Sequence, residues 1–66
     1  MQVIINGETK QIERELNLQE LLKKLELPTE RIAIELNKTV VRKKDWAAVK
    51  EADSDKIEII HFVGGG

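Results

Sequence analysis

Apolar residues in this chain fall into short segments with the period of strands, apart from one segment with the period of a helix. Residues 1–5 are rich in β-branched side chains, and Asn6-Gly7 separates them from residues 8–12. Asn-Gly between two such segments predicts a hairpin, because a type I′ turn needs positive φ at both central positions. A two-residue turn also fixes the register, so Val3 should face Lys10 and Ile4 should point away from the core. The residues on the core face are then Met1, Val3, Ile5 and Ile12.

The helical segment starts at a clear capping signal. Asn17 is a favourable N-cap, and Glu20 lies at the third helical position, where a capping box places its reciprocal acceptor. Leucines then recur at i, i+3, i+4 and i+7, which predicts one apolar stripe packed on the core. Pro28 disfavours helical geometry at the residue before it, so we expect the helix to end by about Glu26. The stripe consists of Leu18, Leu21, Leu22 and Leu25.

The second half of the chain predicts further strands. Residues 31–36 alternate cleanly between apolar and polar, and Asn37-Lys38 predicts a turn into a short strand at residues 39–41. Residues 42–53 lack sustained periodicity, which favours a loop with a helical turn, and Trp46 should anchor that loop to the core. A turn at residues 53–55 leads into a last strand at residues 56–62.

The last strand is apolar on both faces. Ile57 and Ile59 share the core side, whereas Ile60 and Phe62 point outward with Glu58. Single exposed apolar residues are ordinary, but a contiguous group indicates a surface that binds a partner. If the first and last strands are neighbours, the sequence predicts an outward patch bordered by Glu35 and Glu58. Its members are Ile4, Ala33, Ile60 and Phe62.

The chain ends in Val63-Gly64-Gly65-Gly66. Three glycines cannot pack a core, because they lack Cβ atoms and lose the most conformational freedom on ordering. They would suit a thin arm that carries a carboxylate about 13 Å into the active site of another protein. A frayed end or an expression remnant is the alternative. We therefore expect a domain at residues 1–62 and a flexible arm at residues 63–66.

Composition narrows the functional classes. Charged residues make up 35% of the 66 residues but nearly cancel to a net charge of −1, which argues against nucleic acid and anionic membranes as partners. The sequence has no cysteine, no apolar run long enough to span a bilayer and no signal-peptide pattern. We expect a cytoplasmic protein whose partners are other proteins.

No catalytic constellation is visible in the sequence. His61 is the single histidine, and no second histidine or cysteine stands at metal-ligand spacing. The carboxylates are scattered over polar faces, and the terminal glycines do not precede a helix as those of a P-loop do. The sequence therefore predicts a protein that is not an enzyme and holds no metal.

The predicted order of strands around one leucine-striped helix favours an α+β, ubiquitin-like β-grasp fold, with a mixed sheet of four to five strands packed on one main helix. Four sets of residues carry a resemblance to a known family: residues 1–3 with Asn6, residues 18–22, residues 36–38 leading to Val41-Arg42 and Trp46, and residues 55–57 through the terminal glycines. Over essentially its whole length the chain resembles the ThiS family, the ubiquitin-like sulfur carriers of thiamin biosynthesis. Ser54, where many relatives have glycine, and the additional Gly64 depart from the family pattern.

The resemblance implies a chemical role for Gly66. A ubiquitin-activating-enzyme-like adenylyltransferase would use ATP to adenylate the Gly66 carboxylate, and a cysteine-derived persulfide would convert it to a thiocarboxylate. Thiazole synthase would accept the sulfur, and no cofactor would be bound permanently. Three alternatives remain: a carrier like the small subunit of molybdopterin synthase, a ubiquitin-like protein modifier, and a plain β-grasp binding module.

Overall fold

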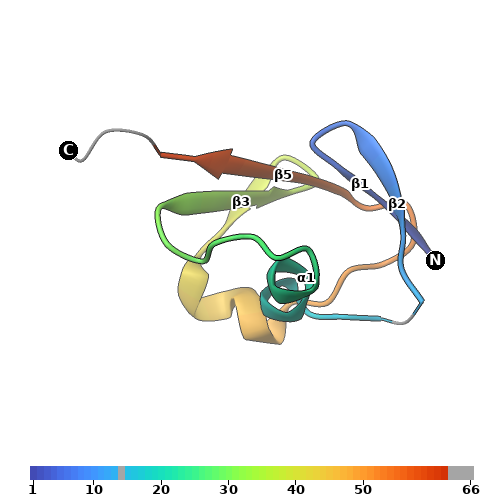
Figure 1. The fold of residues 1–66 in the computed structure, drawn as a ribbon, viewed down its shortest axis with the longest axis horizontal. Helices are drawn as coiled ribbons and strands as arrows, with labels where there is room; N and C mark the ends of the chain where they lie inside the picture. Colours follow the sequence, from blue (N-terminus) through green and yellow to red (C-terminus); the bar gives the residue numbers. More distant parts are fainter. Residues whose placement is uncertain (14, 63–66) are drawn as a thin grey trace.

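The fold is a five-stranded mixed sheet with one helix and one 3-10 helix on the same side (Figure 1). The computed structural model describes residues 1–13 and 15–62. The strands are ordered β2-β1-β5-β3-β4, so the last strand lies in the centre of the sheet. This arrangement is the predicted α+β, β-grasp architecture. In chain order the elements are β1 (Gln2–Ile5), β2 (Glu8–Gln11), α1 (Leu18–Lys24), β3 (Ile32–Leu36), β4 (Thr39–Val41), the 3-10 helix η1 (Lys43–Ala48) and β5 (Lys56–His61).

The first hairpin has the register that its turn predicts. Val3 pairs with Lys10, and Met1 exchanges two backbone hydrogen bonds with Ile12, with N–O distances of 2.8 and 2.9 Å. Asn6 and Gly7 both have positive φ, at 49° and 83°, as a type I′ turn requires. The hairpin therefore directs Val3 into the core.

The helix begins and ends at local hydrogen-bonded signals. The Asn17 side chain accepts from the Glu20 amide at 2.8 Å, and the Glu20 carboxylate accepts from the Asn17 amide at 3.0 Å, which completes the predicted capping box. At the other end Glu26 adopts a φ of 57°, and the Leu27 amide donates to the Leu22 carbonyl at 2.9 Å. This Schellman geometry ends α1 at Lys24, earlier than Pro28 alone required.

The core fills the space between the inward face of the sheet and the helical layer. The leucine stripe of α1 packs there as predicted, and Trp46 of η1 is 1% exposed and donates its indole N–H to the Val41 carbonyl at 2.9 Å. Trp46 thus anchors the loop of residues 42–53 to the core. The other buried apolar residues are Val3, Ile5, Ile12, Leu16, Ile34 and Ile57.

Two turn asparagines fix the central strand by hydrogen bonds to its backbone. The Asn6 side chain accepts from the Ile59 amide at 2.8 Å, and the Asn37 side chain accepts from the Lys56 amide at 2.9 Å. Asn37 also donates to Asp55 at 3.0 Å. Because β1 pairs with β5 only as far as Ile57, Asn6 supplies the partner that the Ile59 amide would otherwise lack.

Glu51 is the one buried charged residue in the described part of the chain. Its side chain is 1% exposed, and neither carboxylate oxygen accepts a hydrogen bond from the described residues. Burial raises the pKa of Glu51, the nearby amides of Glu51 and Leu16 oppose this rise in part, and the carboxylates of Asp55 and Glu20 add to it. Ionised Glu51 therefore destabilises the folded state.

We predict that Glu51→Gln stabilises the protein increasingly as the pH rises. The folded pKa lies above the unfolded value near 4.5, so the folded state holds more protons between the two values. The stability contributed by Glu51 is complete below the unfolded pKa and is lost as the pH rises through the folded pKa, with a slope of at most about 1.4 kcal/mol per pH unit. Urea unfolding of both proteins from pH 4 to 8 measures the difference. A difference in unfolding free energy between the two proteins that does not change with pH would contradict a raised pKa for Glu51.

Candidate functional site

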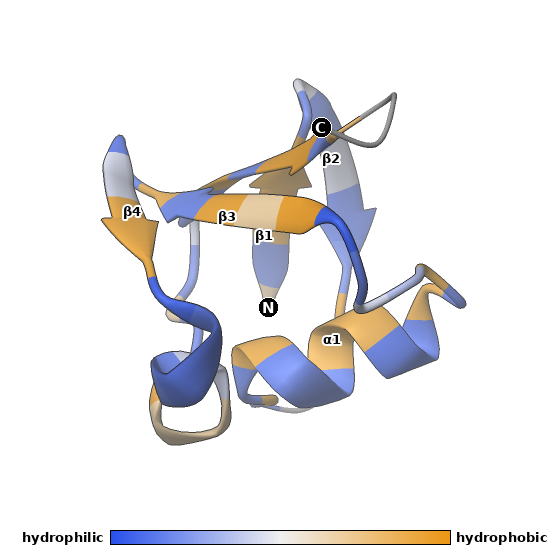
Figure 2. Ribbon diagram, turned by 90° about the vertical axis from the view of Figure 1, so that its left-hand side faces the viewer, coloured by the Kyte–Doolittle hydropathy of each residue, from blue (hydrophilic) through white to orange (hydrophobic). Residues whose placement is uncertain are grey.

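The outward face of β3 and β5 carries an apolar group, which we define as the half-buried Ala33 and the exposed Ile60 and Phe62. Ala33 lies directly opposite Ile60 in the antiparallel pair, and the Phe62 amide donates to the Arg31 carbonyl at 2.8 Å. Ile60 is 45% exposed and Phe62 is 55% exposed. Figure 2 shows hydrophobic colouring along the middle of β3. Among residues 1–13 and 15–62, the helical layer covers only the opposite face of the sheet.

Ile4 lies on the same face but is set apart from the apolar group. β1 and β5 are neighbours, as expected, and they run parallel with Ile4 opposite Lys56. Lys56 precedes Ile60 by four residues on β5, which corresponds to about 13 Å along a strand. The structure therefore brings together Ala33, Ile60 and Phe62 of the predicted outward patch, and it places Ile4 at the other end of the face.

Two carboxylates occupy the stretch between Ile4 and the apolar group. Glu35 of β3 lies directly opposite Glu58 of β5, and Val40 of β4 lies opposite Glu35 on its other side. Val40 is 63% exposed, although the sequence analysis assigned it no role. The Asn37-Lys38 turn could have predicted this exposure, because a two-residue turn places Val40 across from Glu35 and hence on the outward face. The carboxylates thus have apolar neighbours on two sides.

The predicted arm, Val63, Gly64, Gly65 and Gly66, lies outside the described residues. Phe62, the last described residue, is the sequence neighbour of Val63. The apolar group is therefore the part of the described domain that lies next to the arm in the chain.

The described residues contain no group of three metal-ligating side chains that could hold an ion. His61 is exposed at the end of β5, where its backbone pairs with Ile32. A hollow of about 410 Å³ beside α1 includes Glu20, but the Glu20 carboxylate already accepts the capping hydrogen bond from Asn17. Within residues 1–13 and 15–62, no helix has the length and apolar character needed to cross a bilayer.

The geometry fits a binding surface. Exposed apolar side chains grouped at the end of the central strand are typical of a surface that contacts a partner.

The chain is similar to known proteins in both sequence and structure. It superposes on the crystal structure of the thiamine biosynthesis protein ThiS from Geobacter metallireducens with a TM-score of 0.89, 32% identity and full coverage of both chains. It is 41% identical to the sulfur carrier protein ThiS of Bacillus subtilis over 49 residues, which are 74% of each chain. It is also 36% identical over all 66 residues to a thiazole synthase from Paramagnetospirillum magneticum, of which it spans only 20%.

The sequence model of the ThiS family matches residues 3–66, which is nearly the whole chain. The structural superposition covers the whole chain and the Bacillus relative covers 74% of it, and both agree with this match. The chain therefore belongs to the ThiS family.

Proposed function

We propose that the chain is a sulfur carrier for the thiazole ring of thiamin, with Gly66 as the site of attachment. An adenylyltransferase joins the Gly66 carboxylate to the α-phosphate of ATP and releases pyrophosphate. The terminal sulfur of a cysteine-derived persulfide then attacks the acyl carbon and displaces AMP, and a thiol cleaves the resulting S–S bond to leave a thiocarboxylate. The chain is a substrate in these steps and not a catalyst.

The observation that carries the proposal is the exposed apolar group on the outward face, followed in the sequence by the terminal glycines. Membership of the ThiS family supports the chemistry of sulfur transfer. The match to a thiazole synthase supports the choice of acceptor, because a segment similar to this entire chain occupies one fifth, 20%, of that protein. Thiazole synthase is therefore the acceptor that we favour over the large subunit of molybdopterin synthase.

Activation explains why the terminus carries glycines. A carboxylate becomes a good electrophile only when its oxygen is a good leaving group, and the mixed anhydride must then be shielded from water. A narrow active-site tunnel gives that shielding and admits only a chain without side chains. The arm and the domain thus have separate tasks, because the domain supplies affinity and the arm supplies the reacting atom.

Intact-mass measurement tests the function directly. The purified chain is incubated with a ThiS-activating adenylyltransferase, ATP and a persulfide donor, and we expect a mass gain equal to the replacement of one oxygen by sulfur. Omission of ATP is the control and should abolish the gain. A chain that stays unmodified under conditions that convert a known ThiS protein would rule the proposal out.

We predict that Gly65→Val slows adenylation about 100-fold or more, because a β-branched side chain in the tunnel displaces the reacting carboxylate. Pyrophosphate release in the presence of the adenylyltransferase gives the rate, and circular dichroism should show an unchanged fold. Gly64→Ala, one residue further from the carboxylate and with a smaller added group, is the matched control and should retain most of the rate. A native rate for Gly65→Val would contradict the threading argument.

We also predict that Ile60→Asp/Phe62→Asp stays folded but binds both the adenylyltransferase and thiazole synthase at least about 100-fold more weakly, since burial of each side chain is worth about 1.5 to 3 kcal/mol. Ala47→Asp/Ala48→Asp adds the same charge at exposed positions of η1, on the helical layer, and should bind normally. Calorimetric titration measures the affinities. Native binding by the first variant would place recognition elsewhere.

A further inference from the structure

Arg31 has a left-handed backbone conformation outside the hydrogen-bonded turns of the described chain. Its φ is 60°, a region in which a residue other than glycine is strained. The other described non-glycine residues with positive φ lie in hairpin turns, in the turn at residues 53–55 or at the end of α1, and Arg31 instead directly precedes β3. They are Asn6, Glu26, Asn37, Lys38 and Ser54. Strain that the surrounding structure maintains is a reason to look for a function.

The strained residue holds Phe62, the last described residue of the chain. The Arg31 carbonyl accepts a hydrogen bond from the Phe62 amide at 2.8 Å. The last register pair of β3 and β5 is Ile32 with His61, so this bond extends the antiparallel ladder by one position beyond β5. The Phe62 side chain is 55% exposed and packs too little to fix the backbone by itself. The Arg31 carbonyl is therefore the contact that fixes the backbone of Phe62.

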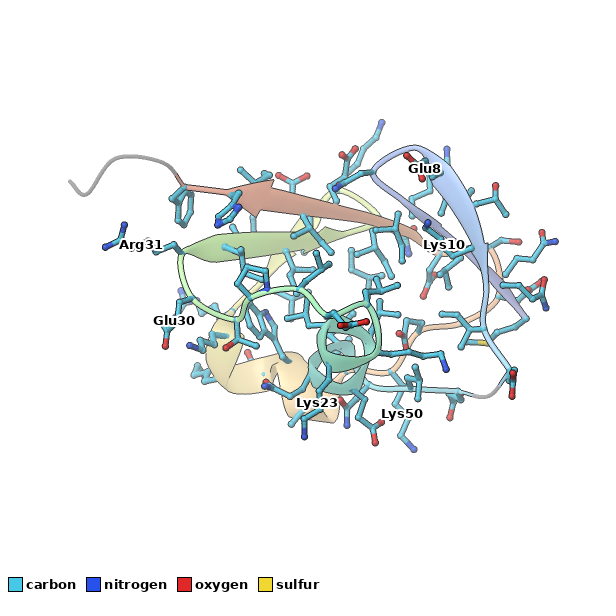
Figure 3. All side chains as sticks on the ribbon, viewed as in Figure 1. Glu8, Lys10, Lys23, Glu30, Arg31 and Lys50 are labelled. Atoms are coloured by element: carbon cyan, nitrogen blue, oxygen red, sulfur yellow. The ribbon has the colours of Figure 1, made fainter. Side chains whose placement is uncertain are left out.

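The contact depends on the backbone of Arg31 and not on its charge. Figure 3 shows the Arg31 side chain pointing away from the sheet at the start of β3, and none of the ion pairs among residues 1–13 and 15–62 includes it. Glu30, the preceding residue, pairs with Lys43 at 3.6 Å, but both side chains are more than half exposed, and exposed pairs contribute little. The φ of Arg31 thus determines where its carbonyl lies.

We propose that Arg31 is a positioning residue for the adenylation of Gly66. Its left-handed backbone directs the carbonyl to the Phe62 amide, and this bond sets the point from which the chain continues to Val63. An arm of four residues spans at most about 13 Å, so an arm extended in a tunnel has little slack to absorb a shift of its base. A misplacement of about 1 Å at a reacting group can slow a reaction about 100-fold. The inference rests on the proposed function, because it concerns how Gly66 reaches the adenylyltransferase.

A positioning role and a merely structural role have different kinetic effects, because the carrier is the substrate. Ala33 and Ile60 pair within β3 and β5, so a carrier in which only the Phe62 contact is open still docks. It then binds with its carboxylate out of place, and this non-productive binding lowers kcat. An unfolded carrier does not dock, so partial unfolding raises the apparent KM and leaves kcat unchanged.

The test compares variants at position 31 that remove the same charge but differ in backbone preference. The β-branched side chain of Arg31→Val disfavours the left-handed region, whereas Arg31→Gly and Arg31→Asn accept it. Hydrogen exchange measured by NMR on the isolated chain reports the Phe62 amide, and pyrophosphate release with the purified adenylyltransferase gives kcat and KM. We expect Arg31→Val to speed exchange of the Phe62 amide and to lower kcat, each about tenfold. Arg31→Gly and Arg31→Asn should have nearly native values.

Glu30→Gln is the matched control, because it removes a charge from the adjacent residue and leaves the backbone of Arg31 in place. It should change neither the exchange of the Phe62 amide nor kcat. Should circular dichroism show that Arg31→Val does not fold, Arg31→Ala replaces it, since alanine disfavours the left-handed region less strongly than valine.

Three results would overturn the inference. The first is native exchange of the Phe62 amide in Arg31→Val, and the second is a loss of activity in that variant that appears only in KM. The third is an equal loss of kcat in all the variants at position 31, because the side chain would then act on the enzyme directly. Failure of the proposed function is distinguishable from these results, because the unmodified chain would then never be adenylated, whatever the exchange of its Phe62 amide.

Discussion

The fixed register of β5 between β1 and β3 is the constraint on which the rest of the structure depends. In a strand that is apolar on both faces, hydrophobicity alone barely distinguishes one register from the next, and a slip of one residue would exchange its two faces. The side chains of Asn6 and Asn37 remove this ambiguity by accepting from the Ile59 and Lys56 amides at 2.8 and 2.9 Å. Both asparagines also take the positive φ that their turns need. The turns of two hairpins therefore specify which face of the central strand is core.

A domain of this size has little stability to spare, which makes its unburied apolar surface informative. One helix and one 3-10 helix cover a single face of the sheet, and a core of this size gives only about 3 to 5 kcal/mol of net stability. The chain nevertheless exposes Ile60 and Phe62, opposes two carboxylates on the same face and buries Glu51 without hydrogen-bond partners. The first two features lie on one surface and fit a function in binding. Glu51 lies among the buried residues and is a cost for which the described residues show no binding role.

The features that could be predicted from the sequence are those determined by residues close together in the chain. Asn6-Gly7 determined the register of the first hairpin, and Asn17 with Glu20 determined the start of the helix. Strict alternation determined which face of β3 points inward. The separation of Ile4 from Ile60 could not be predicted in this way, because the parallel pairing of β1 with β5 joins residues about fifty positions apart. The burial of Glu51 could not be predicted either. Glu51 lies in a loop whose sequence has no periodic pattern, and a glutamate in such a loop is usually exposed.

In the proposed function, the domain and the arm would act in a fixed order. The apolar group belongs to the folded domain and precedes the arm in the chain. It would therefore dock first, and the arm would enter the tunnel last, once β5 is held. A terminus of glycines has too few groups to select one enzyme among many, so its chemistry depends on the face of the sheet that precedes it. Because the same face would meet the activating enzyme and the sulfur acceptor, only one of them can hold the carrier at a time, and release from the first must precede delivery to the second.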